Sequence, residues 1–82
     1  MRLTVVYYGG LKQDVGAKRE TLDLPHATLT VRELNDLLRE RHPALASRLR
    51  TVAVAVNDAL VESDHVLHDG DEASLLPPVS GG

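Results

Sequence analysis

Polar and apolar side chains alternate in two short segments near the N-terminus, a pattern typical of half-buried β-strands. The first segment is residues 2–8 and the second is residues 19–24. The loop between them, residues 9–18, has room for a helical turn around residues 11–14. We therefore expect an antiparallel hairpin. In its first strand, Leu3, Val5 and Tyr7 fall on one face, and Thr4, Val6 and Tyr8 fall on the other.

A longer segment follows with the spacing of an amphipathic helix. Thr30 and Glu33 match a capping box, in which the threonine hydroxyl accepts from the Glu33 backbone and the glutamate side chain reaches back to residue 30. The helix should stop before His42-Pro43, because a residue that precedes proline disfavours the helical region. Residues 43–49 are expected to form a short second helix with proline in its first turn. The apolar stripe of the main helix is Val31, Leu34, Leu37 and Leu38.

The second half of the chain predicts further strands. Residues 51–56 are dense in β-branched side chains, as in a buried strand, and Asn57-Asp58 suits a tight turn. A short strand is expected near residues 59–61 and an irregular or minor strand at residues 65–67. The last strand is predicted at residues 72–76, after a glycine turn.

These elements predict an α+β fold in which one helix covers one face of a small mixed sheet. That is the β-grasp arrangement, here with four to five strands, one main helix and a short second helix. Pro77 and Pro78 have no backbone N–H to donate, so they end the last strand. We predict a β-grasp domain over residues 1–76 and a flexible C-terminal tail over residues 77–82.

Length and composition limit the chemistry open to this chain. Its 82 residues make one domain, and a hydrophobic share of 43% is ordinary for a globular protein. The chain has no cysteine, which excludes a disulfide scaffold, a thiolate zinc site, an iron–sulfur cluster and a side-chain thiol nucleophile. The apolar run at the N-terminus is too short for a signal peptide or a membrane span. We expect a cytoplasmic protein with no membrane partner.

Charge is distributed unevenly along the chain. The chain carries −3 overall with histidine neutral, whereas residues 57–82 contain six acidic side chains and no Lys or Arg. This acidic third favours a basic protein partner over a nucleic acid, which it would repel, and a solvated acidic rim is the alternative. Tyr7 and Tyr8 are the only aromatic residues, so nucleic-acid bases have little to stack on.

Side-chain chemistry is only weakly indicated. His65 and His68 lie among acidic residues, but the run includes Gly70 and is typical of a solvated turn rather than a metal site. The glycines after Tyr8 lack the spacing of a phosphate loop, and no serine, histidine and acid stand in a triad pattern. We expect no bound metal and no active site built from side chains.

The C-terminal tail is the better candidate for chemistry. A Pro-Pro pair stiffens its base, and Gly81 and Gly82 lack side chains, so the end can enter a channel too narrow for other residues. Fully extended, residues 77–82 reach roughly 19 Å. The terminal carboxylate of Gly82 is a poor electrophile and needs activation, for example as an acyl-adenylate. Once activated it can take up sulfur as a thiocarboxylate without any cysteine. A frayed tail without function is the alternative.

The residues that end the chain resemble those of a known family. Gly70-Asp71-Glu72 followed by Leu75-Leu76-Pro77-Pro78-Val79-Ser80-Gly81-Gly82 is similar to the C-terminal signature of the molybdopterin synthase small subunit, a ubiquitin-like sulfur carrier. Val54-Ala55-Val56-Asn57 with Leu60-Val61 resembles its central hairpin, and Tyr7-Tyr8 resembles the paired aromatics that end its first strand. The resemblance covers essentially the whole chain. The sequence departs from it at Gly9-Gly10, where the family more often has an alanine-containing start to a short helix.

The resemblance implies a sulfur-donating, non-catalytic subunit that binds no cofactor itself. A ubiquitin-activating-like adenylyltransferase would use ATP to convert Gly82 to a glycyl adenylate, and a sulfurtransferase would replace AMP with sulfur. The thiocarboxylate would then enter the large subunit of molybdopterin synthase and donate sulfur to cyclic pyranopterin monophosphate. The resemblance assigns the threading of that channel to the remaining tail residues, Pro77, Pro78, Val79, Ser80 and Gly81.

Strand parity predicts a docking surface beside the tail. If the helix covers the face that holds Tyr7, then Tyr8 points to the open face, and Leu76 lies opposite to Leu75 in the last strand. With Leu60 after the hairpin turn, these side chains would form an apolar patch for a partner, at positions that match the family's partner contacts. Scattered surface apolar residues are the alternative.

Three other functions remain open from the sequence. A sulfur carrier for thiamine, cysteine or tRNA thiolation would be physically near-identical, and only the Pro77-to-Ser80 signature favours the pterin pathway. A protein modifier would instead join Gly82 to a lysine through an isopeptide bond. A β-grasp RNA-binding module needs no reactive terminus, but the acidic C-terminal third and the scarcity of aromatic residues disfavour it.

Overall fold

Short strands and helices follow one another along residues 1–78, the part of the chain that this computed structural model describes. In chain order they are β1 (Arg2–Tyr7), α1 (Leu11–Val15), β2 (Arg19–Asp23), β3 (Leu29–Thr30), α2 (Val31–Arg41), the 3₁₀ turn η1 (Pro43–Leu45), β4 (Ala53–Val56), β5 (Ala59–Val61), β6 (Val66–Leu67) and β7 (Glu72–Leu76).

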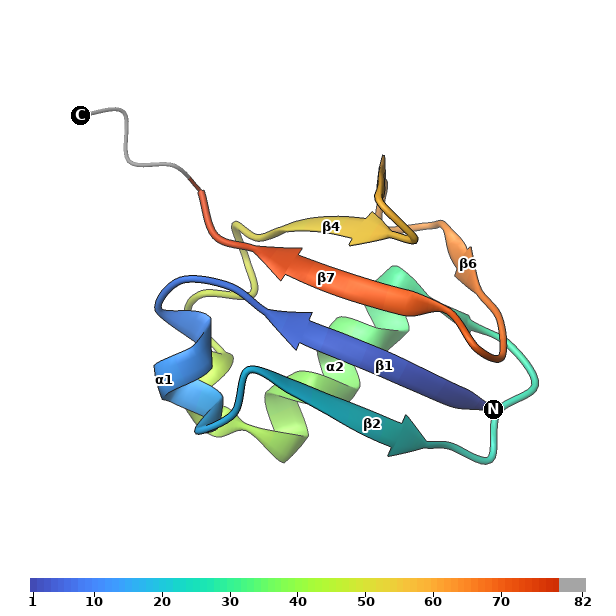
Figure 1. The fold of residues 1–82 in the computed structure, drawn as a ribbon, viewed down its shortest axis with the longest axis horizontal. Helices are drawn as coiled ribbons and strands as arrows, with labels where there is room; N and C mark the ends of the chain where they lie inside the picture. The colour runs from blue at the N-terminus through green and yellow to red at the C-terminus, as the bar shows by residue number, and fades with distance from the viewer. Residues whose placement is uncertain (79–82) are drawn as a thin grey trace.

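Five strands form the main sheet in the order β2-β1-β7-β4-β5, and α2 crosses one of its faces (Figure 1). The first and last strands, β1 and β7, pair in parallel at the centre, with Tyr7 opposite Leu75. The other neighbours pair antiparallel. A second, two-stranded sheet joins β3 to β6. The structure confirms the predicted β-grasp fold with a mixed sheet and one main helix.

The core lies between the main sheet and α2. The strand β1 contributes the three side chains that its alternation predicted, Leu3, Val5 and Tyr7, each fully buried. Val6 on the opposite face is also buried, and its neighbours in the register there are Arg19 of β2 and Ser74 of β7. The helix α2 buries Val31, Leu34 and Leu38 against them, whereas Leu37 is only half-buried.

Both ends of α2 follow the local sequence. Thr30 Oγ1 accepts a hydrogen bond from the Glu33 backbone N–H at 3.1 Å, and Glu33 Oε1 accepts from the Thr30 backbone N–H at 2.9 Å. This is the predicted capping box. The helix ends at Arg41, directly before His42-Pro43, as the proline rule predicted.

The connecting segments differ from the prediction in detail. The second helix expected over residues 43–49 is regular only as the 3₁₀ turn η1, although Leu45 and Leu49 are both buried. The strand expected at residues 51–56 begins at Ala53. The two-residue strand β3 was not predicted, because it exists only through its pairing with β6.

Candidate functional site

The predicted tail begins at the end of β7, a central strand with neighbours on both sides (Figure 1). The Tyr8 backbone N–H donates to the Leu75 carbonyl at 3.3 Å, and Leu76 pairs with Ala53 at the start of β4. Neither following proline can donate to the sheet, so the pairing stops there. Pro77 is half-buried and Pro78 is exposed. The other predicted tail residues, Val79, Ser80, Gly81 and Gly82, lie outside the described residues.

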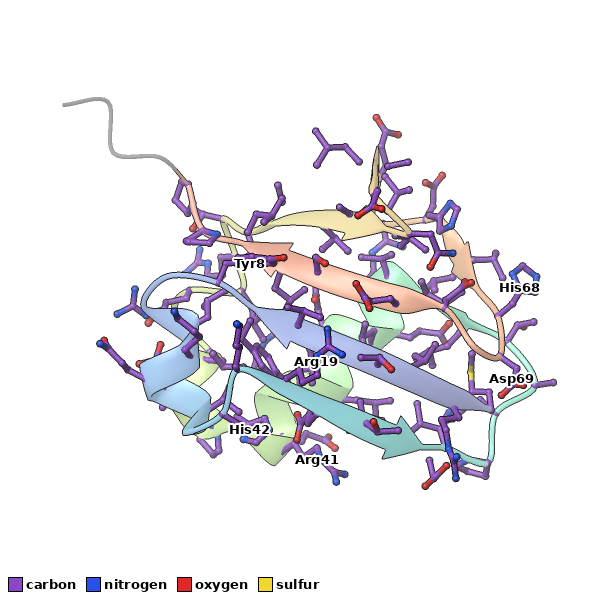
Figure 2. The ribbon with its side chains drawn as sticks, viewed as in Figure 1. Tyr8, Arg19, Arg41, His42, His68 and Asp69 are labelled. Carbon is purple, nitrogen blue, oxygen red and sulfur yellow. The ribbon has the colours of Figure 1, made fainter. Side chains whose placement is uncertain are left out.

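The three residues of the predicted docking patch lie on one face of the sheet, opposite α2. Tyr7 and Leu75 are buried beneath the helix, so the residues after them, Tyr8 and Leu76, point to the open face of neighbouring strands. Leu60 lies farther out on β5, opposite Ala55. In Figure 2, Tyr8 lies near the end of β7 that leads to the tail.

Exposure separates these three side chains. Leu60 is 72% exposed and Tyr8 is 45% exposed, whereas Leu76 is half-buried. The side chains between them on this face are small. Leu60 pairs with Ala55 in the register, Ala55 with Ser74, and Ser74 with Val6. The open face therefore has an apolar half next to the start of the tail. That a partner binds there stays a prediction.

The loop between β1 and α1 lies against the first residue of the tail. Gly9 has a φ of +58°, and a Cβ atom added to it would lie 2.9 Å from Cγ of Pro77. A Cβ atom on Gly10 would lie 2.9 Å from a terminal guanidinium nitrogen of Arg48. Arg48 is itself held by Asp14, with 2.5 Å between Nε and Oδ2. The helical turn expected around residues 11–14 is present as α1, although the sequence departs from the family's pattern at Gly9-Gly10.

Sequence reasoning assigned Gly9 and Gly10 only to the end of a strand and missed this contact. Two glycines at one end of the chain and two prolines near the other were visible in the sequence. Their meeting depends on the parallel pairing of β1 with β7, which brings Tyr7 beside Leu75. Gly9 and Pro77 each lie two residues beyond this pair, so the register places them close to each other.

The acidic residues near His65 and His68 mainly stabilise turns. Asp69 Oδ1 accepts from the Arg2 backbone N–H at 2.7 Å, and Asp71 Oδ2 accepts from the His68 backbone N–H at 2.9 Å. Within residues 1–78, no group of three or more histidine and carboxylate side chains is arranged to hold a metal ion. The same residues contain no helix with the length and apolarity that a membrane crossing requires.

A surface depression of about 410 Å³ lies at the other end of β1 from the tail. Met1, Arg2, Asp23, Leu24 and Asp69 line it. Its charged groups already bind one another: Arg2 Nε lies 2.9 Å from Asp23 Oδ1, and both side chains are largely exposed. This depression offers paired surface charges rather than a set of reactive groups.

Comparisons with known proteins agree with this geometry. The model of the ThiS family matches residues 5–82. The molybdopterin synthase sulfur carrier subunit of Chlamydomonas reinhardtii is 33% identical over 87 residues, with 100% of both chains covered. A solved protein–protein complex of subunits 1 and 2 of molybdopterin-converting factor from Helicobacter pylori contains a chain that is 31% identical, with a TM-score of 0.71 and full coverage of both chains. Small archaeal modifier protein 1 of H. volcanii is 25% identical, with a TM-score of 0.83 over 95% of this chain and 98% of that one.

Proposed function

Because the chain belongs to the ThiS family, we propose that it is a sulfur carrier whose working group is the carboxylate of Gly82. Its homologues include the molybdopterin synthase sulfur carrier subunit of Chlamydomonas reinhardtii, which matches it over the whole length of both chains. The observation that carries the proposal is the course of β7, which leads from the centre of the sheet into Pro77-Pro78 beside the apolar half of the open face. The strand that leads to the C-terminal residues is thus anchored in the core, and the sequence ends in Gly81 and Gly82, which have no side chains.

The proposed chemistry uses the chain end as the reacting group. A carboxylate oxygen of Gly82 attacks the α-phosphorus of ATP in an activating partner, and pyrophosphate leaves. A sulfurtransferase then supplies sulfur at the oxidation level of sulfide, which attacks the Gly82 carbonyl carbon and displaces AMP, so that a thiocarboxylate remains at Gly82. The thiocarboxylate sulfur forms a bond to cyclic pyranopterin monophosphate in the large subunit of molybdopterin synthase. Water then cleaves the bond between this sulfur and the Gly82 carbonyl carbon, which leaves the sulfur on the pterin and restores the carboxylate. The large subunit supplies the catalytic side chains, and this chain supplies the reacting atom.

We assign the docking of the large subunit to the open face of the sheet. The Helicobacter pylori structure is a complex of two subunits of molybdopterin-converting factor, and one of its chains matches this one over its full length. Tyr8 and Leu60 offer exposed apolar surface on the face where the tail begins. A partner that covers this patch would receive the tail directly into its own active site.

Intact-mass measurement tests the proposal. After co-production with the activating enzyme and the sulfurtransferase, we expect the chain to gain about 16 Da, the replacement of one oxygen by sulfur. Deletion of Gly82 should abolish this gain and leave the thermal unfolding midpoint within about 2 °C of the parent, because the core lies within residues 1–78. An unchanged mass with active partners and ATP present would contradict the proposal.

A protein modifier is the second candidate, because the similar chain from H. volcanii is named small archaeal modifier protein 1. The two functions share activation of the terminal glycine and differ in the group that attacks it. A modifier would form an isopeptide bond between Gly82 and a lysine of another protein. Conjugates of higher mass in cell extracts that disappear on deletion of Gly82 would favour the modifier. A terminal thiocarboxylate without conjugates favours the carrier.

A further inference from the structure

The base of the tail is held at one point by a glycine of a distant segment. Gly9 has left-handed backbone geometry, with a φ of +58°, and the space that its Cβ would occupy is filled by the ring of Pro77. The distance of 2.9 Å from the Cβ position to Pro77 Cγ is shorter than side-chain atoms normally approach. Only a residue without a side chain permits this contact.

The loop that carries Gly9 is itself well fixed. The Leu11 backbone N–H donates to the Tyr8 carbonyl at 3.2 Å, and the Lys12 N–H donates to the Gly9 carbonyl at 3.2 Å. These bonds tie Gly9 to the first turn of α1. On the far side of the loop, the Arg48 guanidinium lies against Gly10. A fixed loop on one side and a ring with a locked φ on the other make a defined contact.

We propose that Gly9 is a positioning residue for the reacting end: it seats the Pro77 ring and thereby sets the direction in which the tail leaves β7. The proposal rests on the proposed function, since a direction matters only if the end must enter a partner's site. Gly82 lies five residues beyond Pro77, so a small change at the base shifts the reacting carboxylate. Displacement of a reacting group by about 1 Å can cost about a hundredfold in rate.

The chain provides a matched control for this glycine. Gly16 also has a left-handed φ, +83°, but no heavy atom lies within 4 Å of the position that its Cβ would take. Gly9→Ala and Gly16→Ala therefore carry a similar backbone strain, and only Gly9→Ala pushes against Pro77. The assay is ATP–pyrophosphate exchange by the activating enzyme, with the whole carrier as the varied substrate.

We expect Gly9→Ala to lower kcat by about tenfold or more and to leave the KM for the carrier within about twofold, because the substitution changes none of the carrier's exposed charged or large apolar side chains. Gly16→Ala should leave both constants within about twofold of the parent. Equal effects of the two substitutions, or a raised KM with unchanged kcat for Gly9→Ala, would overturn the proposal.

A double-mutant cycle with Pro77→Ala identifies the contact itself. Pro77→Ala removes the Cγ atom that Gly9→Ala would meet, so Gly9→Ala should have little further effect on kcat in that background. A full additional loss would place the cause in the backbone and overturn the proposal. The same cycle in urea unfolding of the isolated carrier tests the contact without any partner. If the parent chain supports no ATP–pyrophosphate exchange, the proposed function fails and the positioning role fails with it. If the effects of Gly9→Ala and Pro77→Ala on the free energy of unfolding are additive, only the contact is refuted.

Discussion

At the scale of single residues, Glu20 joins three separate elements. The hydroxyl of the buried Tyr7 donates to Glu20 Oε1, and His42 Nε2 lies 2.8 Å from the same oxygen. Burial, and then the hydrogen bond with Glu20, raises the pKa of Tyr7 far above its ordinary value. Burial also acts to raise the pKa of Glu20, but the hydrogen bonds from Tyr7 and His42 outweigh it and the pKa is lowered. The folded protein therefore favours the charged carboxylate.

Glu20→Gln is predicted to flatten the fall in stability at acid pH. A carboxyl whose pKa is lower in the folded state stabilises the protein above its ordinary pKa, and this contribution is lost as the pH falls through the folded pKa. About a fifth of the side chain stays exposed, so we expect a loss of about 1 kcal/mol in the free energy of unfolding between pH 6 and pH 3, larger in the parent than in Glu20→Gln. Urea unfolding across this range measures it.

Glu62→Gln is the matched control, because it removes an exposed carboxylate from the loop after β5. It should reproduce the pH profile of the parent. If Glu20→Gln and Glu62→Gln gave the same profile, the hydrogen bonds of Glu20 would not be the source of the acid sensitivity.

The sequence predicts the unusual position of Glu20 but not the partners of its side chain. Glu20 has the same parity as Leu22 in the predicted strand, so a carboxylate stands where the alternation places core residues. Such a pattern indicates a polar group that is at least partly buried and therefore needs hydrogen-bond partners. The partners themselves could not be predicted, because they come from β1 and from the residue after α2, which only the folded arrangement brings near.

At the scale of elements, the β4–β5 hairpin turns through two residues with left-handed geometry. Asn57 has a φ of 48° and Asp58 a φ of 73°. The side chain of Asn57 stabilises this position, because its Nδ2 donates to Asp71 Oδ1 at 3.1 Å and its Oδ1 accepts from the Glu72 backbone N–H at 3.1 Å. These bonds tie the hairpin to the start of β7. Turns of this kind favour an Asn-Gly sequence.

Asp58→Gly is predicted to stabilise the protein by about 0.5 kcal/mol, because glycine adopts the left-handed φ without steric cost. Asn57→Gly is the contrasting variant: it relieves similar strain but loses both side-chain hydrogen bonds, so it should be neutral or destabilising. Chemical unfolding midpoints of the two variants decide the question. A stabilised Asn57→Gly together with a destabilised Asp58→Gly would show that the turn is not controlled by backbone geometry.

The elements that were predictable are those whose signals are local. The start of α2 was predicted because Thr30 and Glu33 are both caps within one turn, and its end because proline acts on the residue before it. The strand β3 carries no such signal, since its two residues extend only to pair with β6. Residues 43–49 had helical composition, but the chain there turns toward β4 after a single 3₁₀ turn.

At the scale of the whole molecule, strand parity and sheet order decide what lies beside the tail. Parity alone placed Tyr8 and Leu76 on the open face, and the register confirms that they follow the buried pair Tyr7 and Leu75. Parity could not reveal that Gly9 contacts Pro77, because that contact depends on which strands are neighbours. The face on which a side chain lies follows from the sequence of its own strand, whereas its contacts with other strands depend on the order of strands in the sheet.

Leu60→Asp is predicted to weaken binding of the molybdopterin synthase large subunit by about tenfold or more, because it places a charge on the exposed apolar surface that the proposed docking would remove from water. Leu60 is 72% exposed, so its substitution should leave the unfolding midpoint nearly unchanged. Val66→Asp is the matched control, since Val66 is an exposed apolar residue, 41% exposed, but lies on β6 in the small sheet. Calorimetric titration of the large subunit with each variant measures the difference. Equal weakening by both variants would mean that general surface charge governs the complex. Unchanged binding of Leu60→Asp would show that the outer strand β5 is not part of the docking face and that the contact is confined to the side chains next to the tail.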